Sequence, residues 1–546
     1  MSDLRDDHNS AVDGAQRGAA VLDPLGDRTL TDLLDERANA DGDRVFLLFE
    51  PNDGSTVELT YGAFRARVER CAAGLAARGL VKGDFAVLHL RNCPELLVAW
   101  FALARLGVVT IPSNVANTVG ELEHIVSFTE PKLLVTEPSL LATADGAIAA
   151  AGLDVPVLVA REEAPGPARE RFELLLESEG DAPRPAVSGD DLAELIFTSG
   201  TTRKPKAVML THANCLRAGQ DAVHCLWLHE GERCLTALPL FHVNGQAMSL
   251  FATLTVAGTL VLIEEFRASR FWSQVRAHRA TQTCIVAMQL RTLLARPAEA
   301  GERDHSLRRL FYAINVTDDE REAFEGRFGV SLINGYGLSE AMTLLTVAPI
   351  VGPRRWPSIG LASPGRRLEL VGPDGEPVAP GEVGEIVAHG TPGRDLMLGY
   401  YRDPEATAQA LRDGRLYTGD NAWADDAGYL YFFDRKKDMI KRAGENVSAI
   451  EVEGALVAHP GVAEAAVVGV PDAIRDEAVA AVVVPVTPGA LTEADLIEHC
   501  RTRLSKFKVP TVVAFVDELP KTSIGKVRKD ELRRALVNAA PAAPNG

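Results

Sequence analysis

Apolar positions along the chain alternate between helical spacing and short continuous runs. Residues 60–75 have the pattern of a helix, and the apolar run 85–90 that follows predicts a buried strand. The same order returns in a helix at 99–106 with a strand at 107–112, and in strands at 132–136 and 155–159. Helices that alternate with buried apolar strands are typical of parallel sheets covered by helices. The pattern therefore predicts a large α/β domain over residues 27–434.

The pattern changes twice in the rest of the chain. Residues 365–389 hold short strands separated by turn pairs, which predicts a small β-rich subdomain. After Asp434 a polar loop at 435–446 leads into an expected α+β lobe over 435–536, a usual size for an independent domain. Its expected elements are a helix at 452–457, strands at 465–470 and 478–484, a helix at 496–504 and a strand at 511–516. Residues 1–26 and 537–546 are expected to form disordered tails.

Size and charge narrow the class of protein. A chain of 546 residues exceeds what one hydrophobic core serves, and 46% hydrophobic with 24% charged residues is ordinary for a globular protein. A net charge of -18 disfavours nucleic acid and anionic membranes as partners, because like charges repel. Any phosphate site must therefore be local.

The cysteines and the hydropathy of the chain indicate its cellular compartment and whether it spans a membrane. The seven cysteines contain no CxxC pair, which argues against a zinc site or a disulfide framework and favours a reducing cytoplasm. The N-terminal residues lack the layout of a signal peptide. The most apolar stretch, 249–263, is too short to span a bilayer. We therefore expect a cytoplasmic protein without a membrane span.

A polar loop after the apolar strand at 195–197 is the first candidate site. Backbone N–H groups and hydroxyls in such a loop bind anions, and Lys206 would add a point charge on a phosphate chain. A solvated, Ser/Thr-rich surface loop is the alternative interpretation. The candidate phosphate-binding residues before the lysine are Thr198, Ser199, Gly200, Thr201 and Thr202.

Further motifs follow this loop in a fixed order, at 239–245, 335–340, 417–420, 434–438, 444–446 and 519–526. With these motifs the chain resembles the acyl-adenylate-forming superfamily over about residues 30–535. Within that superfamily, segments 311–315, 354–360, 440–448, 474–477 and 506–510 are most similar to the carnitine/crotonobetaine-CoA ligase branch. The resemblance implies two parallel-type sheets wrapped by helices, a small β subdomain and a mobile α+β C-terminal lobe.

The resemblance implies an ATP-dependent acid-CoA ligase. Such an enzyme activates a small or polar carboxylic acid as acyl-AMP and transfers the acyl group to CoA, releasing AMP and pyrophosphate. The expected substrates and cofactors are the acid, ATP, CoA and Mg²⁺, and a homodimer is the expected assembly. Two alternatives keep adenylation: transfer to a carrier protein or an amine, and activation of nitrite by an ATP-dependent diazotase. A regulatory relative without turnover is a third, which the retained motif residues disfavour.

The resemblance assigns ATP and metal roles residue by residue. Glu340 is the candidate Mg²⁺ ligand, since this ion takes one or two carboxylates and otherwise phosphate and water oxygens; a helix-capping acid is the alternative. Thr198 is assigned to the same metal. Tyr336 is expected against the adenine, while Asp420 would accept both ribose hydroxyls with help from Arg435. The remaining nucleotide-binding candidates are Gly335, Gly337 and Ser339.

The C-terminal lobe is expected to serve both half-reactions. By resemblance, Lys526 reaches the α-phosphate and the carboxylate during adenylation. The lobe then turns about Lys437 and presents Gly444 to the pantetheine of CoA. Glycine at that position lets the backbone approach a narrow channel.

The acyl pocket is expected around the 239–245 motif. His242 is a candidate catalytic residue that orients the carboxylate, although a buried structural histidine is the competing interpretation. The other pocket candidates are Val243, Asn244, Gly245, Asn315 and Leu338. Their small and polar mixture favours a modest acid over a long fatty chain. Arg203 and Ala207 stand where the superfamily has glycines, which leaves the detailed loop geometry open.

Overall fold

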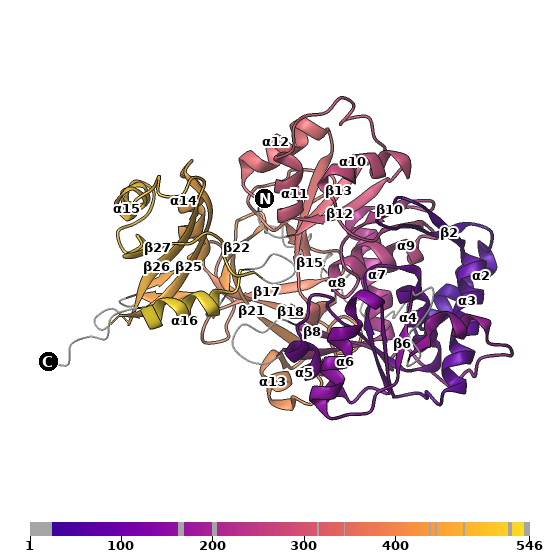
Figure 1. Ribbon diagram of the computed structural model, residues 1–546. Helices are drawn as coiled ribbons and strands as arrows, with labels where there is room; N and C mark the ends of the chain where they lie inside the picture. Colours follow the sequence, from indigo (N-terminus) through magenta and orange to yellow (C-terminus); the bar gives the residue numbers. More distant parts are fainter. Residues whose placement is uncertain are drawn as a thin grey trace, which may run out of the picture. The chain divides into compact units, whose positions relative to one another are not determined.

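The chain forms an α/β fold with mixed sheets and a separate β-rich C-terminal part, as expected (Figure 1). The computed structural model describes residues 25–161, 169–198, 205–313, 316–342, 344–435, 438–442, 445–472, 476–521 and 527–539. Two compact units divide the chain. The first contains Met1–Thr198, Lys206–Arg367 and His389–Leu416, and the second contains Ser199–Pro205, Leu368–Ala388 and Tyr417–Gly546. The expected division after residue 434 stays a prediction.

An eight-stranded sheet in the first unit has the order β19-β9-β8-β4-β3-β5-β6-β7. Its strands from β8 to β7 are parallel, whereas β9 runs antiparallel to both β8 and β19. The strands are β3 (Phe85–His89), β4 (Val109–Pro112), β5 (Leu133–Thr136), β6 (Val157–Val159), β7 (Glu170–Arg171), β8 (Leu192–Thr198), β9 (Lys206–Thr211) and β19 (Gly399–Tyr400). Buried Val, Ile and Leu from these strands form one core with α5 (Val119–Thr129) and α6 (Leu141–Ala151).

A nine-stranded sheet in the same unit has the order β16-β15-β14-β13-β12-β10-β11-β1-β2. Neighbours from β14 to β1 are parallel, and antiparallel strands close both ends. The strands are β1 (Val45–Glu50), β2 (Val57–Thr60), β10 (Arg233–Thr236), β11 (Thr259–Ile263), β12 (Gln282–Val286), β13 (Arg309–Ala313), β14 (Ser331–Gly337), β15 (Leu344–Val347) and β16 (Leu361–Ala362).

Helices connect these strands. They are α2 (Leu30–Ala40), α3 (Tyr61–Ala77), α4 (Pro94–Leu106), α7 (His212–Leu226), α8 (Val243–Gly245), a π-helix (Gln246–Phe251), α9 (Ala252–Thr255), α10 (Ala268–Ala277), α11 (Ala287–Leu294), α12 (Asp318–Phe328) and α13 (Pro404–Ala410). Helix α4 begins five residues before the expected start at residue 99. Proline at the first helical position fixes a helical φ, and Gly107 ends the helix in the left-handed conformation with φ 69°.

Two further sheets carry most of the second unit. One has the order β17-β18-β21-β20 with β22 beside β21, and the other has the order β24-β23-β26-β25 with β27 beside β26. Their strands are β17 (Arg367–Val371), β18 (Gly384–His389), β20 (Leu411–Arg412), β21 (Arg415–Ala424), β22 (Leu430–Arg435), β23 (Ile440–Arg442), β24 (Glu445–Val447), β25 (Val462–Asp472), β26 (Asp476–Pro485) and β27 (Val512–Phe515). The helices are α14 (Ala449–Val457), α15 (Glu493–Arg501) and α16 (Lys529–Ala539).

The polar stretch 435–446 was expected to be a loop, and here the structure differs. It contains the antiparallel pair β23–β24, with Ile440 opposite Val447. Both side chains are fully buried in the core of the C-terminal lobe. A single apolar residue at each end of a polar hairpin anchors these two short strands, which is too little periodicity for sequence reasoning to detect.

The ends of the described chain are more ordered than expected. Leu25 is buried, and helix α16 continues to Ala539, three residues into the expected C-terminal tail. Residues 1–24 and 540–546 lie outside the described residues. No helix in the described part of the chain is long and apolar enough to cross a membrane.

Candidate active site

The predicted phosphate loop connects two paired strands. Thr198 ends β8, Lys206 begins β9, and the two residues are Cα partners in the antiparallel ladder. The Thr198 hydroxyl donates to the Lys206 carbonyl at 3.4 Å. The hairpin therefore brings together the two ends of the loop, and both residues are half-buried. The loop candidates Ser199, Gly200, Thr201 and Thr202 lie outside the described residues.

The glycine-tyrosine motif continues the last parallel strand of the nine-stranded sheet. Gly335 lies on β14 so close to β15 that a Cβ atom would stand 2.5 Å from the Thr346 carbonyl oxygen. Glycine is required here because its backbone approaches a paired strand closely. The next residue, Tyr336, donates its backbone N–H to the Thr346 hydroxyl at 3.2 Å and is half-buried. After Gly337 the strand ends.

A short turn after β14 positions Glu340. Residues Ser339–Ala341 form one 3₁₀ turn, which Met342 closes by donating its N–H to the Ser339 carbonyl at 3.0 Å. The Glu340 carbonyl in turn accepts from the Met397 N–H at 2.7 Å. The side chain of Glu340 is half-buried. The backbone of the Glu340 turn is thus fixed by one hydrogen bond within the turn and by another from Met397.

Tyr400 joins the Glu340 carboxylate to the phosphate-loop lysine. The Tyr400 hydroxyl donates to Oε1 of Glu340 at 2.8 Å. The Lys206 ammonium lies over the same ring, 4.4 Å from its centroid. Burial, with the neighbouring Glu340 charge, raises the pKa of the Tyr400 phenol well above its usual value, so the hydroxyl stays a donor. Sequence reasoning missed this residue because a tyrosine beside a glycine in an apolar segment resembles a core aromatic.

The 239–245 motif forms a turn after β10 whose backbone is held from outside. Asn92 donates to the Leu238 carbonyl at 3.0 Å and accepts from the Leu240 N–H at 3.1 Å. Gln246 donates to the Leu240 carbonyl at 2.9 Å. At Gly245 a Cβ atom would stand 2.9 Å from the Pro239 carbonyl oxygen. We call residues 237–245 the acyl turn.

A buried acid lies behind the acyl turn. Glu194, on β8, is fully buried and accepts from the Gln246 side chain at 3.2 Å. Burial raises the pKa of its carboxyl to about 8, against hydrogen bonds from Gln246 and Cys215 that lower it. At pH 7 Glu194 is therefore a neutral carboxylic acid whose hydrogen bond holds the side chain of Gln246 in place. The surrounding apolar strand gave no sign that this residue would matter.

The pocket candidates on the acyl turn lie next to one another. His242 packs its ring 4.6 Å from that of Phe241, and the Cys284 thiol donates to the side-chain oxygen of Asn244 at 3.0 Å. His242, Val243 and Asn244 are half-buried, as is Leu338. Asn315 lies outside the described residues.

Topology places the acyl turn and the Glu340 turn at the same edge of one sheet. The acyl turn follows β10 and the Glu340 turn follows β14, and the strands between them in the sheet are parallel. The carboxyl ends of parallel strands meet at one edge, which is where open α/β sheets bind ligands. This edge is the candidate active site of the first unit.

The expected ribose pair lies in the second unit. Asp420 on β21 and Arg435 on β22 are Cα partners, and their side chains form an ion pair with Nε 3.4 Å from Oδ1. Asp420 is 6% exposed. Beside them, Asp434 accepts the backbone N–H groups of Arg435 at 2.7 Å and Ala449 at 2.6 Å, and burial raises the pKa of its carboxyl. The candidates Lys437, Gly444 and Lys526 lie outside the described residues.

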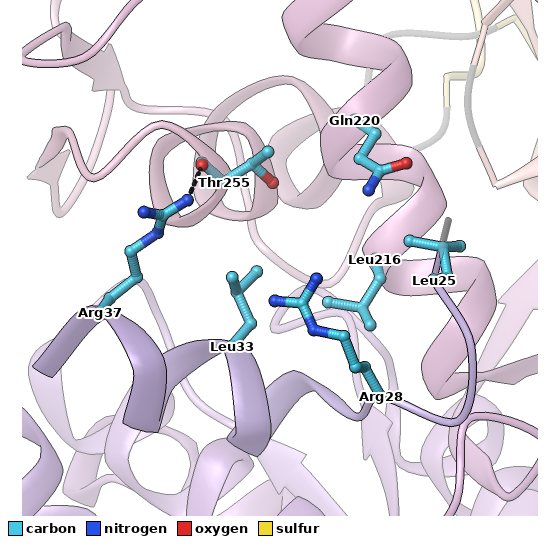
Figure 2. A pocket seen from close by; sticks show the side chains of 7 residues that line it. All are labelled: Leu25, Arg28, Leu33, Arg37, Leu216, Gln220 and Thr255. Atoms are coloured by element: carbon cyan, nitrogen blue, oxygen red, sulfur yellow. Dashed lines mark hydrogen bonds between the residues drawn. The ribbon is translucent and has the colours of Figure 1, made fainter. Parts of the chain in front are cut away.

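The first unit also contains a cavity away from the motif residues. It lies among α2, α7 and α9, and it holds none of the motif residues (Figure 2). Arg37, one of its lining residues, donates to the carbonyls of Leu254 at 3.2 Å and Thr255 at 2.5 Å, which caps the end of α9. Its lining residues are Leu25, Arg28, Leu33, Arg37, Leu216, Gln220 and Thr255.

Two family matches cover most of the chain. The family of AMP-binding enzymes matches residues 34–401, and the AMP-binding enzyme C-terminal domain matches residues 451–526. A crotonobetaine/carnitine-CoA ligase of Salmonella paratyphi A is 36% identical over 524 residues, covering 94% of this chain and 100% of the relative. The Salmonella agona protein of the same name is 35% identical over 522 residues, with the same shares covered.

Solved structures of CoA ligases have the same fold as this chain. ATP-bound MatB from Rhodopseudomonas palustris superposes with a TM-score of 0.82 at 29% identity, covering 93% of this chain and 99% of that one. The anthranilate CoA ligase AuaEII, in complex with anthranoyl-AMP, has a TM-score of 0.84 at 25% identity, covering 94% and 98%. A benzoate CoA ligase from Burkholderia xenovorans LB400 has a TM-score of 0.82 at 25% identity, covering 93% and 100%. The chain therefore belongs to the AMP-binding enzyme family, as an AMP-forming acyl-CoA ligase.

Proposed function

We propose that the acid activated by this ATP-dependent acid-CoA ligase is small and polar. The observation that carries the proposal is the acyl turn, which is held by Asn92 and Gln246 and presents His242 and Asn244 at the carboxyl edge of the sheet. A polar amide on a fixed turn suits a polar substituent of the substrate: the Asn244 side-chain oxygen accepts from the Cys284 thiol, and its amide N–H groups are donors that a polar acid would use and a long alkyl chain would not. The related CoA ligases named for crotonobetaine and carnitine support a polar acid.

The first half-reaction joins two anions. The substrate carboxylate attacks the α-phosphorus of ATP, the bond to the β-phosphate oxygen breaks, and pyrophosphate leaves. Charge on the phosphates must be screened and the reactants aligned. In this proposal Lys206 and the hydroxyl of Thr198 bind the phosphates from the ends of the loop, and His242 orients the carboxylate.

The residues present suit a magnesium site that phosphates complete. Tyr400 occupies Oε1 of Glu340, which leaves Oε2 as the oxygen for a metal. Mg²⁺ takes few protein carboxylates and otherwise phosphate and water oxygens. Within the described ranges no group of three or more His, Cys, Asp or Glu side chains is arranged to hold a metal by itself. In this proposal Glu340 and Thr198 would hold the ion, which when bound lowers the charge of the phosphates.

The remaining residues of the proposed nucleotide site bind the adenine and the ribose of ATP. Tyr336 packs against adenine, with Gly335, Gly337 and Ser339 around it. Asp420, kept in place by Arg435, accepts the ribose hydroxyls.

Lys526 reaches the α-phosphate during adenylation. The lobe then turns about Lys437, and Gly444 lines the path of pantetheine as the thiol of CoA attacks the acyl carbon and AMP leaves. A homodimer is proposed as the assembly, and sedimentation velocity tests it.

Pyrophosphate release from ATP, with and without CoA, tests this function. The panel contains short aliphatic acids, acids that carry a quaternary ammonium group, benzoate, long fatty acids and nitrite. We expect a small polar acid to give the highest kcat/KM and a thioester to form with CoA. A preference for long fatty acids would contradict the proposed substrate class. Pyrophosphate release that never leads to a thioester would instead favour a carrier protein or an amine as acceptor, and release only with nitrite would favour a diazotase.

A further inference from the structure

We propose that Tyr400 is a positioning residue for adenylation, whose hydroxyl fixes the carboxylate of Glu340 and whose ring holds the ammonium of Lys206. The inference rests on the proposed function of Glu340 and Lys206. One phenol thereby sets the distance between a candidate metal ligand and a candidate phosphate ligand that are more than a hundred residues apart in the sequence.

The backbone around Tyr400 is fixed on both sides. Strand β19 pairs with β9, so that Tyr400 lies opposite Val208, two residues after Lys206. On either side of β19, the N–H of Leu398 donates to the Met209 carbonyl at 2.9 Å and that of Tyr401 donates to the Ala207 carbonyl at 2.8 Å. The N–H of Tyr400 donates to the Thr407 hydroxyl at 2.9 Å. The ring therefore projects from a rigid strand beside the exit of the phosphate loop.

The same segment is tied to the Glu340 turn. Met397, three residues before Tyr400, donates its N–H to the Glu340 carbonyl at 2.7 Å. The phenol donates to Oε1 of the same residue at 2.8 Å. Backbone and side chain of Glu340 are thus held by one short segment. A carboxylate fixed through one oxygen presents its other oxygen in a defined direction, which is what an ion of strict geometry such as Mg²⁺ requires.

The face of the Tyr400 ring contacts the positive charge of Lys206. An ammonium within about 6 Å of a ring centroid is attracted by the negative face of the ring, and Lys206 lies at 4.4 Å. Lysine has a flexible stem that this contact confines. The edge and the face of one ring therefore order an anion and a cation at the same time. Removing the hydroxyl alone frees only Glu340, whereas removing the ring frees both.

Three variants separate these two effects. Tyr400→Phe keeps the ring over Lys206 and removes the donor to Glu340. Tyr400→Leu removes both. Tyr401→Phe is the matched control, since its ring packs against Phe85 and Phe128 with centroids 5.2 and 5.7 Å apart. The binding of Mn²⁺ is measured by electron paramagnetic resonance, with a non-hydrolysable ATP analogue present, so the readout does not depend on turnover.

We expect Tyr400→Phe to raise the Mn²⁺ dissociation constant by about tenfold, because a hydrogen bond to a charged group is lost. Its metal-free affinity for the analogue should equal that of wild type. Tyr400→Leu should lose metal-free affinity for the analogue as well, while its affinity for AMP, which lacks the outer phosphates, should not change. Conversion of preformed acyl-AMP and CoA into thioester should proceed at the wild-type rate in Tyr400→Phe.

A double-variant cycle checks that Tyr400 acts through Glu340. If it does, Tyr400→Phe added to Glu340→Gln should weaken Mn²⁺ binding no further than Glu340→Gln alone. Equal Mn²⁺ affinity in Tyr400→Phe and Tyr401→Phe would overturn the inference, as would an equal loss in both half-reactions, which indicates general damage to the fold. A wild-type protein that releases no pyrophosphate with any acid would refute the proposed function, while the Mn²⁺ measurement would still test Tyr400.

Discussion

Replacing Glu194 by glutamine should change how stability depends on pH. The carboxyl is fully buried on β8, and burial raises its pKa from 4.5 to about 8. Glutamine has nearly the same shape and keeps an oxygen that accepts from Gln246, which now lies 3.2 Å from Oε2. The substitution therefore removes the titration and leaves the packing behind the acyl turn in place.

The sign follows from the proton count. Between pH 4.5 and about 8 the folded protein holds a proton on Glu194 that the unfolded chain has released. The stability that this proton contributes is complete below pH 4.5, falls as the pH rises, and is lost above the folded pKa. The slope is about 1.4 kcal/mol per pH unit. From pH 5.5 to 7.5 the free energy of unfolding of Glu194→Gln should therefore rise by about 2–3 kcal/mol relative to wild type.

Urea unfolding followed by tryptophan fluorescence measures this difference at pH 5.5, 6.5 and 7.5. Four of the five tryptophans report on the first unit, which contains Glu194; they are Trp100, Trp227, Trp272 and Trp356. The matched control is Glu137→Gln. Burial acts to raise the pKa of Glu137, but hydrogen bonds from Ser139 and Arg91, with the charges of Arg91 and Arg161, lower it overall. Its titration lies below this window.

The control should therefore differ from wild type by a constant amount at all three pH values. If Glu194→Gln behaves in the same way, Glu194 is ionised in the folded protein and the reasoning from burial is refuted. A difference that grows with pH only for Glu194→Gln supports a neutral acid behind the acyl turn.

Three further substitutions test individual contacts. Gly335→Ala should lower the free energy of unfolding by about 1–3 kcal/mol, because the new Cβ would meet the Thr346 carbonyl oxygen at 2.5 Å; an unchanged urea midpoint would contradict this. Asn92→Ala should raise the KM for the acid several-fold and leave the KM for ATP unchanged, since it frees the acyl turn; equal effects on both constants in the pyrophosphate assay would argue against it. Asp420→Asn should raise the KM for ATP by about tenfold, because the ribose loses a charged acceptor. The same variant should no longer prefer ATP to its 2′,3′-dideoxy analogue, and an intact preference would refute the ribose role.

The layered α/β fold was predictable because its determinants are local. Apolar runs such as 85–90 and 132–136 correspond to the buried strands β3 and β5. Element ends were less predictable. The start of α4 depends on Pro94, and the β23–β24 hairpin depends on Ile440 and Val447, which pack into a core assembled from distant segments.

The residues of the candidate site were also only partly predictable from the sequence. Motif residues such as Glu340 and Asp420 lie within short runs that resemble those of the superfamily, so the resemblance assigned their roles, which stay predictions. Tyr400 and Glu194 act through contacts with residues 60 and 52 positions away. Nothing in their local sequence indicates those partners, and only the folded chain brings them together.

The way in which the acyl turn is held has a consequence for how such enzymes diversify. Amides from Asn92 and Gln246 hold its backbone, and the missing side chain at Gly245 lets that backbone come close to Pro239. The side chains at 242–244 stand on this backbone, so a change among them can alter the pocket while the contacts of Asn92 and Gln246 stay in place. Enzymes of this kind can therefore change their substrate specificity by a few substitutions at this turn, while the sheet that carries it stays the same.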